Sequence, residues 1–165
     1  MHPFFVCFFS QNLEQYLRSH PACDVSAGFR HSYMVTDGQL RRQSILRSGS
    51  TSVTCVVRAT AEGKRMLHIA NVGDSRAVLC RGGQAIRLTI DHKASLPEEA
   101  KRIREAGGFI GRNKRVNGVL AISRALGDHM VSGLRALTYG TQRAMVGVFL
   151  HALLVAFLFP CCLFS

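Results

Sequence analysis

Residues 67–83, LHIANV-GDSR-AVLC-RGG, decide the fold. Leu67 to Val72 and Ala77 to Cys80 are short apolar runs with β-branched residues, and a glycine-containing turn follows each of them. Such runs predict strands, and Arg81-Gly82-Gly83 predicts a hairpin turn into a further strand at Ala85 to Thr89. A β-branched run at Thr51 to Arg58 precedes them and is also typical of a strand. Together the four runs predict an antiparallel meander.

Helical patterns lie on both sides of these strands. Apolar residues at helical spacing predict helices at Gln11 to Arg18 and at Asp37 to Leu46. Ser95-Leu96-Pro97-Glu98 has capping-box spacing and predicts a third helix, which Gly107-Gly108 ends. Its apolar face carries Ala100, Ile103 and Ala106. Strands mixed with segregated helices indicate an α+β domain.

A further turn signal follows the third helix. Arg115 to Leu120 contains Asn117-Gly118 between apolar residues, which is the strongest short-range hairpin signal.

The composition excludes several classes of protein. Apolar residues make up 47% of the 165 residues, which is too many for a disordered chain. The sequence has no repeat of fixed period, which excludes a collagen and a solenoid. The six cysteines are dispersed without a C-x-x-C pair, which argues against a disulfide scaffold and a zinc site and favours a reducing compartment. A formal charge of +11 favours anionic partners. Nucleic acid is not expected, because the cationic residues are dispersed and lack interleaved aromatic residues.

The two ends of the chain differ from its middle. Residues 1–10 form an apolar leader without the basic region or cleavage site of a signal peptide, so we expect a frayed or partly buried start. A basic linker, 134–143, separates the middle from an apolar tail, 144–165.

The tail has 16 consecutive uncharged residues, Ala144 to Phe159, at the lower limit of length for a helix that spans a bilayer. Two alternatives stay open: a C-terminal membrane helix over 144–163 that anchors a cytoplasmic domain, and a buried tail. The last four residues also fit the C-a-a-X pattern for lipidation at Cys162, but the match is so short that chance is the better explanation.

Residues 11–133 contain short motifs in a definite order. They are Ser48-Gly49-Ser50-Thr51, Ala70-Asn71-Val72-Gly73-Asp74-Ser75-Arg76, Asp91-His92-Lys93, Arg115-Val116-Asn117-Gly118 and Ser123-Arg124-Ala125-Leu126-Gly127-Asp128. In this order they resemble the metal-dependent protein phosphatase 2C family over roughly Gln11 to Asp128. The resemblance implies a β-sandwich of two antiparallel sheets flanked by helices. It also implies hydrolysis of phosphoserine and phosphothreonine in proteins, with Mg²⁺ or Mn²⁺ held by aspartates.

The resemblance covers only the central part of the family's domain. The chain has no Glu-Asp pair and no Asp-Gly-His-Gly, and no aspartate follows Asp128. The family's core metal ligands come from those motifs, so we expect a partial domain over 11–133 with impaired catalysis. The alternative is a non-catalytic phosphatase-like module that binds a phosphoprotein, either free in the cytoplasm or attached to a membrane through 144–163.

One metal-associated residue carries over from the family. Asp74 matches an aspartate at an additional, weaker metal position; its alternative role is a turn residue that accepts backbone N–H groups. The guanidinium groups of Arg76 and Arg124 suit phosphate clamps, but we expect ion pairs, for instance with Asp74 or Asp128.

The remaining candidates receive structural roles. Asp37 begins the only Asp-Gly in the chain and is expected at a surface or capping position, while Asp128 is expected to be structural. Ser50 and Thr51 are not nucleophile candidates, because no base stands beside them in sequence and the family uses metal-bound water. His68 and His92 are expected to be ordinary packing or surface residues.

Overall fold

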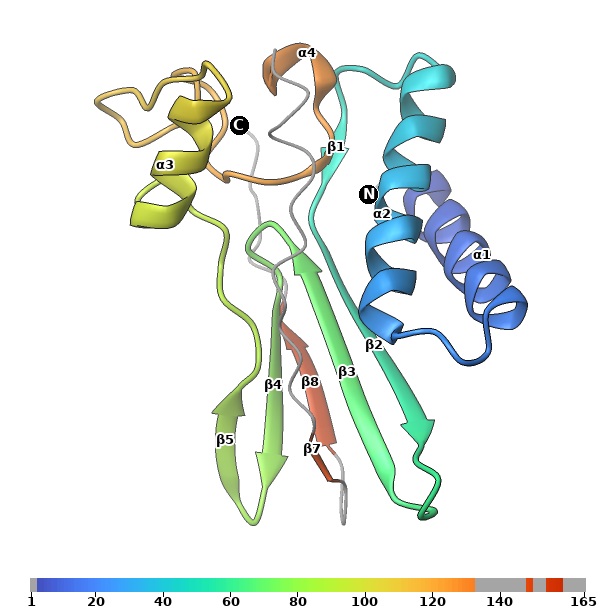
Figure 1. Ribbon diagram of the computed structural model, residues 1–165. Helices are drawn as coiled ribbons and strands as arrows, with labels where there is room; N and C mark the ends of the chain where they lie inside the picture. Colours follow the sequence, from blue (N-terminus) through green and yellow to red (C-terminus); the bar gives the residue numbers. More distant parts are fainter. Residues whose placement is uncertain (1–2, 133–147, 150–153, 159–165) are drawn as a thin grey trace.

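The computed structural model describes residues 3–132, 148–149 and 154–158 (Figure 1). The elements, in chain order, are α1 (Pro3–Ser19), α2 (Val25–Arg42), β1 (Gly49–Ser50), β2 (Ser52–Ala59), β3 (Arg65–Val72), β4 (Arg76–Arg81), β5 (Gln84–Arg87), α3 (Pro97–Glu105), β6 (Leu126–Gly127), α4 (His129–Ser132), β7 (Val148–Phe149) and β8 (Leu154–Leu158).

The two N-terminal helices are longer than the sequence pattern predicts. Helix α1 contains the expected Gln11–Arg18 but starts at Pro3, so residues 3–10 of the leader are helical rather than frayed, and Phe9 is buried. Helix α2 starts at Val25, because the Asp24 carboxylate caps it by accepting the Ser26 N–H at 3.0 Å. The helix predicted at Asp37 to Leu46 is therefore only the end of a longer helix, which stops at Arg42.

Most strands form two three-stranded antiparallel sheets rather than one meander, while the short strands β1 and β6 pair only with each other. One sheet has the order β2-β3-β7 and the other β5-β4-β8. The predicted hairpin between β4 and β5 is confirmed: Arg81 pairs with Gln84, and both Gly82 and Gly83 have positive φ. Strands β3 and β4 follow each other in sequence but belong to different sheets, and this corrects the meander.

Strand β3 lies at the centre of the layers because both of its faces are buried. Ala70 and Val72 pack with α1 and α2, whereas Leu67 and Ile69 pack with Ala77 and Leu79 of the second sheet and with Leu88, which follows β5. Alternate residues of a strand point to opposite faces, so the sheet β2-β3 is covered by the helix pair on one side and by the second sheet on the other. Figure 1 shows α1 and α2 side by side along β2 and β3.

A third apolar cluster surrounds α3. Ile103 of this helix packs with Ala94 and Val116. The predicted capping box at Ser95 is wrong: Leu96 is the N-cap and makes no side-chain cap hydrogen bond, with Pro97 in the first turn. The predicted end is confirmed, since Gly107 has φ +82° and the Gly108 N–H donates to the Ile103 carbonyl at 2.9 Å.

The loop after α3 is held by a tight turn rather than by a regular hairpin. Asn117 and Gly118 both have positive φ, and Val116 forms isolated bridges with Ile110 and Leu120.

The described parts of the apolar tail are strands. Strand β7 pairs with β3, and β8 pairs with β4 over Arg76 to Cys80. The apolar helix expected over 144–163 is therefore wrong for residues 148–149 and 154–158. Among the described residues, no helix combines the length and apolar character that crossing a bilayer requires. The linker 134–143, the rest of the tail and Cys162 lie outside the described residues.

Candidate functional site

The candidate site is the turn between β3 and β4, residues Gly73 to Ser75. It joins the two sheets, so its position is set by both. Asp74 is 8% exposed, and within the described part of the chain its buried Oδ1 has no hydrogen-bond partner. A buried carboxylate oxygen without a partner is costly to keep. The alternative prediction for Asp74 is a turn carboxylate that accepts backbone N–H groups. Among the described residues, Oδ1 accepts no such group.

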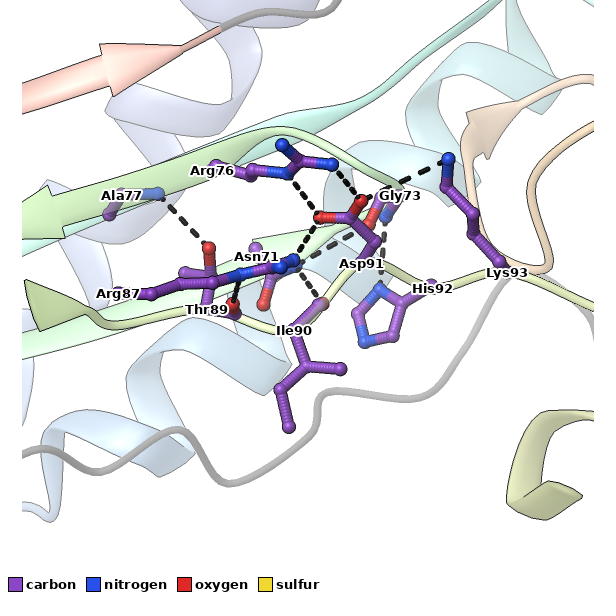
Figure 2. A network of polar contacts seen from close by, with 10 residues as sticks. All are labelled: Asn71, Gly73, Arg76, Ala77, Arg87, Thr89, Ile90, Asp91, His92 and Lys93. Carbon is purple, nitrogen blue, oxygen red and sulfur yellow. Dashed lines mark hydrogen bonds and ion pairs between the residues drawn. The ribbon is translucent and has the colours of Figure 1, made fainter. Parts of the chain in front are cut away.

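Beside this turn, Asp91 is the centre of a polar network (Figure 2). Its carboxylate accepts from Arg76 Nε at 2.8 Å and Nη2 at 2.6 Å, and from Arg87 Nη2 at 2.5 Å. Lys93 Nζ lies 4.0 Å away. The hydrogen bond from Arg76 is the main cause that lowers the Asp91 pKa below its usual range. Arg76 thus pairs with Asp91 and not with Asp74 or Asp128, which corrects the expected partner.

A second buried carboxylate, Glu99 on α3, holds Arg124. Glu99 is 1% exposed and accepts from Arg124 Nε and Nη2, from Arg102 Nη2 at 2.7 Å and from Ser123 Oγ at 2.6 Å. Burial raises the Glu99 pKa, but the hydrogen bonds from Arg124, Arg102 and Ser123 outweigh it and bring the pKa to about 2. The expected partner of Arg124, Asp74 or Asp128, is wrong here too. Both arginines thus form ion pairs with carboxylates, Arg124 in a buried position and Arg76 with 40% of its side chain exposed.

Asp37 is not at the surface. It is 1% exposed on α2, and its carboxylate accepts the Gly127 N–H at 2.8 Å and lies 3.5 Å from His129 Nε2. The expectation of a surface or capping residue is wrong, because strand β6 (Leu126–Gly127) packs on this face of α2.

Asp128 is half-buried with φ +51°, and burial raises its pKa. Its carboxylate fills the space that a Cβ at Gly49 would need.

The hydroxyl and histidine candidates occupy packing positions. Thr51 Oγ1 lies 2.7 Å from Ser75 Oγ, and Ser50 Oγ donates to the Thr51 carbonyl at 3.0 Å. His68 is half-buried on β3, and burial lowers its pKa. His92 is fully buried, so the surface alternative is wrong for it, and burial lowers its pKa to about 4.

The fit of a divalent cation rests on Asp74 alone. Across residues 3–132, 148–149 and 154–158 no three His, Cys, Asp or Glu side chains gather closely enough to hold a metal ion. The orphaned Oδ1 of Asp74 fits one ligand of a hydrated ion, since Mg²⁺ keeps several waters and is often held by one or two carboxylates. The family's paired-ion site needs more carboxylates than this turn supplies.

Comparison with known proteins decides the family. The family model described as protein phosphatase 2C matches residues 8–138. The chain belongs to the protein phosphatase 2C family. It is 39% identical over 134 residues to protein phosphatase 2C homolog 1 of Saccharomyces cerevisiae, and 42% identical over 131 residues to probable protein phosphatase 2C 59 of Oryza sativa subsp. japonica. The resemblance inferred from the motifs is confirmed.

Solved structures match the fold of this chain. A structure described as that of a C. elegans sex determining protein matches with a TM-score of 0.71 and 28% identity over 84% of this chain. A phosphatase from Toxoplasma gondii matches with a TM-score of 0.60 and 23% identity, which supports the fold. The chain spans 47% and 38% of the yeast and rice relatives and 35% of the C. elegans chain.

Sequence reasoning missed Glu99 as the buried partner of both Arg102 and Arg124. A signal was present: Glu99 is four residues before Ile103 and three before Arg102, so it lies on the same helix face as the buried Ile103. A carboxylate on an apolar face indicates a buried cation partner.

Proposed function

We propose that this chain is a protein serine/threonine phosphatase of the protein phosphatase 2C family whose hydrolytic step is impaired. Family membership over residues 8–138 supports the reaction class. The observation that carries the impairment is the single carboxylate at the turn: Asp74 offers one oxygen without a partner, and the described residues supply no cluster that would complete a paired-ion site.

The substrate in this proposal is a protein phosphorylated on serine or threonine. The net charge of +11 would draw such a phosphoprotein toward the domain. When bound, Mg²⁺ or Mn²⁺ would activate water and neutralise phosphoryl oxygens. Asp74 would hold the cation, while Arg76 and Arg124 maintain the fold through their carboxylate partners rather than binding the phosphoryl group.

The test is hydrolysis of a phosphothreonine peptide by the purified 165-residue chain with Mn²⁺, compared with Asp74→Asn and with a metal-only blank. We expect a slow rate above the blank that Asp74→Asn abolishes. A rate typical of active enzymes, about 1–10³ s⁻¹, would show that the hydrolytic step is not impaired. No rate above the blank from folded protein would reject the catalytic proposal.

A second candidate is a binding module that retains phosphoproteins without hydrolysis. It is favoured by the same lack of a metal-ligand cluster among the described residues. It predicts that a phosphothreonine peptide stays bound when EDTA is present, and loss of binding in EDTA would reject it. In both versions we place the domain in the cytoplasm, where free thiols such as Cys23 and Cys55 persist.

A further inference from the structure

Both backbone polar groups of Gly73 are bound by one residue, His92. The Gly73 N–H donates to His92 Nδ1 at 3.1 Å, and the Gly73 carbonyl accepts the His92 N–H at 2.9 Å. Figure 2 shows the His92 ring turned toward Gly73, the residue immediately before Asp74. His92 is itself fixed, because it is fully buried and its carbonyl accepts the Ser123 N–H at 2.9 Å.

Further contacts restrict the backbone of the turn on both sides of Asp74. Gly73 has φ +86°, and a Cβ at this position would overlap the Thr51 side chain. On the other side of Asp74, Ser75 Oγ lies 2.7 Å from Thr51 Oγ1 and Ser75 is fully buried. The residues before and after Asp74 are therefore held, while Oδ1 of Asp74 has no partner within the described residues.

The contact with Gly73 determines the state of the imidazole. Nδ1 accepts a hydrogen bond only in the neutral tautomer that carries its proton on Nε2. The low pKa of the buried ring, about 4, agrees with a neutral ring near neutral pH. His92 Nε2 makes no hydrogen bond to any described residue, so the contribution of the ring to this turn is through Nδ1.

We propose that His92 is a positioning residue for Asp74: its Nδ1 and backbone N–H fix the Gly73 peptide groups and so hold the Asp74 carboxylate ready for a divalent cation. This inference rests on the proposed function of Asp74 as a cation ligand. Residues that orient a ligand are worth tenfold to a hundredfold in metal affinity. The two carboxylates that act electrostatically on the ring, Glu99 and Asp91, are both paired with arginines.

The experiment compares three variants of the full chain. His92→Asn keeps an acceptor on Cγ, where Nδ1 is attached, and His92→Leu has none. Asp74→Asn removes the cation ligand. Mn²⁺ affinity is measured by electron paramagnetic resonance, and the exchange rate of the Gly73 amide by NMR. Far-UV circular dichroism confirms that each variant is folded; if His92→Leu is not, His92→Gln replaces it, since its acceptor is attached to Cδ instead of Cγ.

We expect His92→Leu to weaken Mn²⁺ binding by about tenfold to a hundredfold and to speed exchange of the Gly73 amide. His92→Asn should retain both properties, which a general packing defect would not allow. Unchanged Mn²⁺ affinity in folded His92→Leu, or an equal loss in His92→Asn, would overturn the role of His92. Equal Mn²⁺ binding by the unmodified chain and Asp74→Asn would instead reject the cation site itself, and the role of His92 in it.

Discussion

Replacement of Glu99 by glutamine tests how much the buried ion pairs of this carboxylate stabilise the fold around α3. At neutral pH the Glu99 side chain is ionised, since its pKa is about 2, and it accepts hydrogen bonds from Arg124, Arg102 and Ser123. Glu99→Gln keeps the size of the side chain but leaves Arg124, which is 8% exposed, without its counter-ion. Removing one partner of a buried ion pair costs about 3–5 kcal/mol.

The direction and size of the Glu99 pKa shift, which the same contacts cause, agree with this magnitude. The folded pKa, about 2, lies below the ordinary value of 4.5, so the carboxylate stabilises the fold above pH 4.5 and this contribution is lost as the pH falls toward 2. At 1.36 kcal/mol per pH unit, the difference amounts to about 3 kcal/mol. We therefore expect the unfolding free energy at pH 7 to fall by about 3–5 kcal/mol in Glu99→Gln.

Urea unfolding followed by circular dichroism measures this change, since the chain has no tryptophan. Glu105→Gln is the matched control on the same helix: Glu105 pairs with Lys101 at 3.8 Å on the exposed face, where an ion pair contributes little. A loss in Glu99→Gln no larger than in Glu105→Gln would refute the assignment of Glu99 as the buried anchor of the arginines.

Three further predictions concern the turn and its neighbours. Asp37→Leu should lower the unfolding free energy in urea by about 1–3 kcal/mol, because a buried backbone N–H loses its acceptor; unchanged stability would contradict this. Gly73→Ala should be more destabilising than Gly63→Ala, since both have positive φ but only a Cβ at Gly73 meets Thr51, and equal losses in thermal unfolding would contradict the overlap. His92 stays neutral in the folded chain until the pH falls to its pKa of about 4, but it ionises near pH 6.5 when the chain is unfolded. The free energy of unfolding should therefore fall by about 3 kcal/mol between pH 6.5 and pH 4, and His92→Asn should lack this change.

Local features were predictable from the sequence where backbone conformation alone decides them. The Gly82-Gly83 turn and the helix end at Gly107 are confirmed, and Asn117-Gly118 forms a turn with positive φ at both residues, although not the regular hairpin that its signal predicts. Each depends on a residue type that tolerates the left-handed region, and this requirement is visible without knowledge of the fold.

Features that depend on distant neighbours were not predictable in the same way. Strand runs at β3 and β4 are evident, but their placement in separate sheets depends on which faces are buried. The start of α2 was missed even though Asp24, a good N-cap residue, precedes Val25. Ser26, Gly28 and Ser32 stand among its apolar residues, so the helical spacing of the apolar residues is hard to recognise in the sequence.

The candidate site was predicted in part. Asp74 could be selected from the family motif, whereas the partners of Arg76 and Arg124 could not. Asp91 lies 15 residues from Arg76, and Glu99 lies 25 residues from Arg124. Only the turn after β4 and helix α3 bring these residues together in the fold. The local sequence pattern therefore does not indicate which carboxylate each arginine pairs with.

The most direct test is a crystal structure of the chain grown with Mn²⁺, with diffraction data collected to give the anomalous signal of manganese. We predict an anomalous peak beside Asp74 Oδ1, with water completing the coordination and the Gly73 peptide groups still bound to His92. An Asp74 carboxylate without an anomalous peak, turned to accept hydrogen bonds from the backbone, would contradict the assignment of this turn as the cation site.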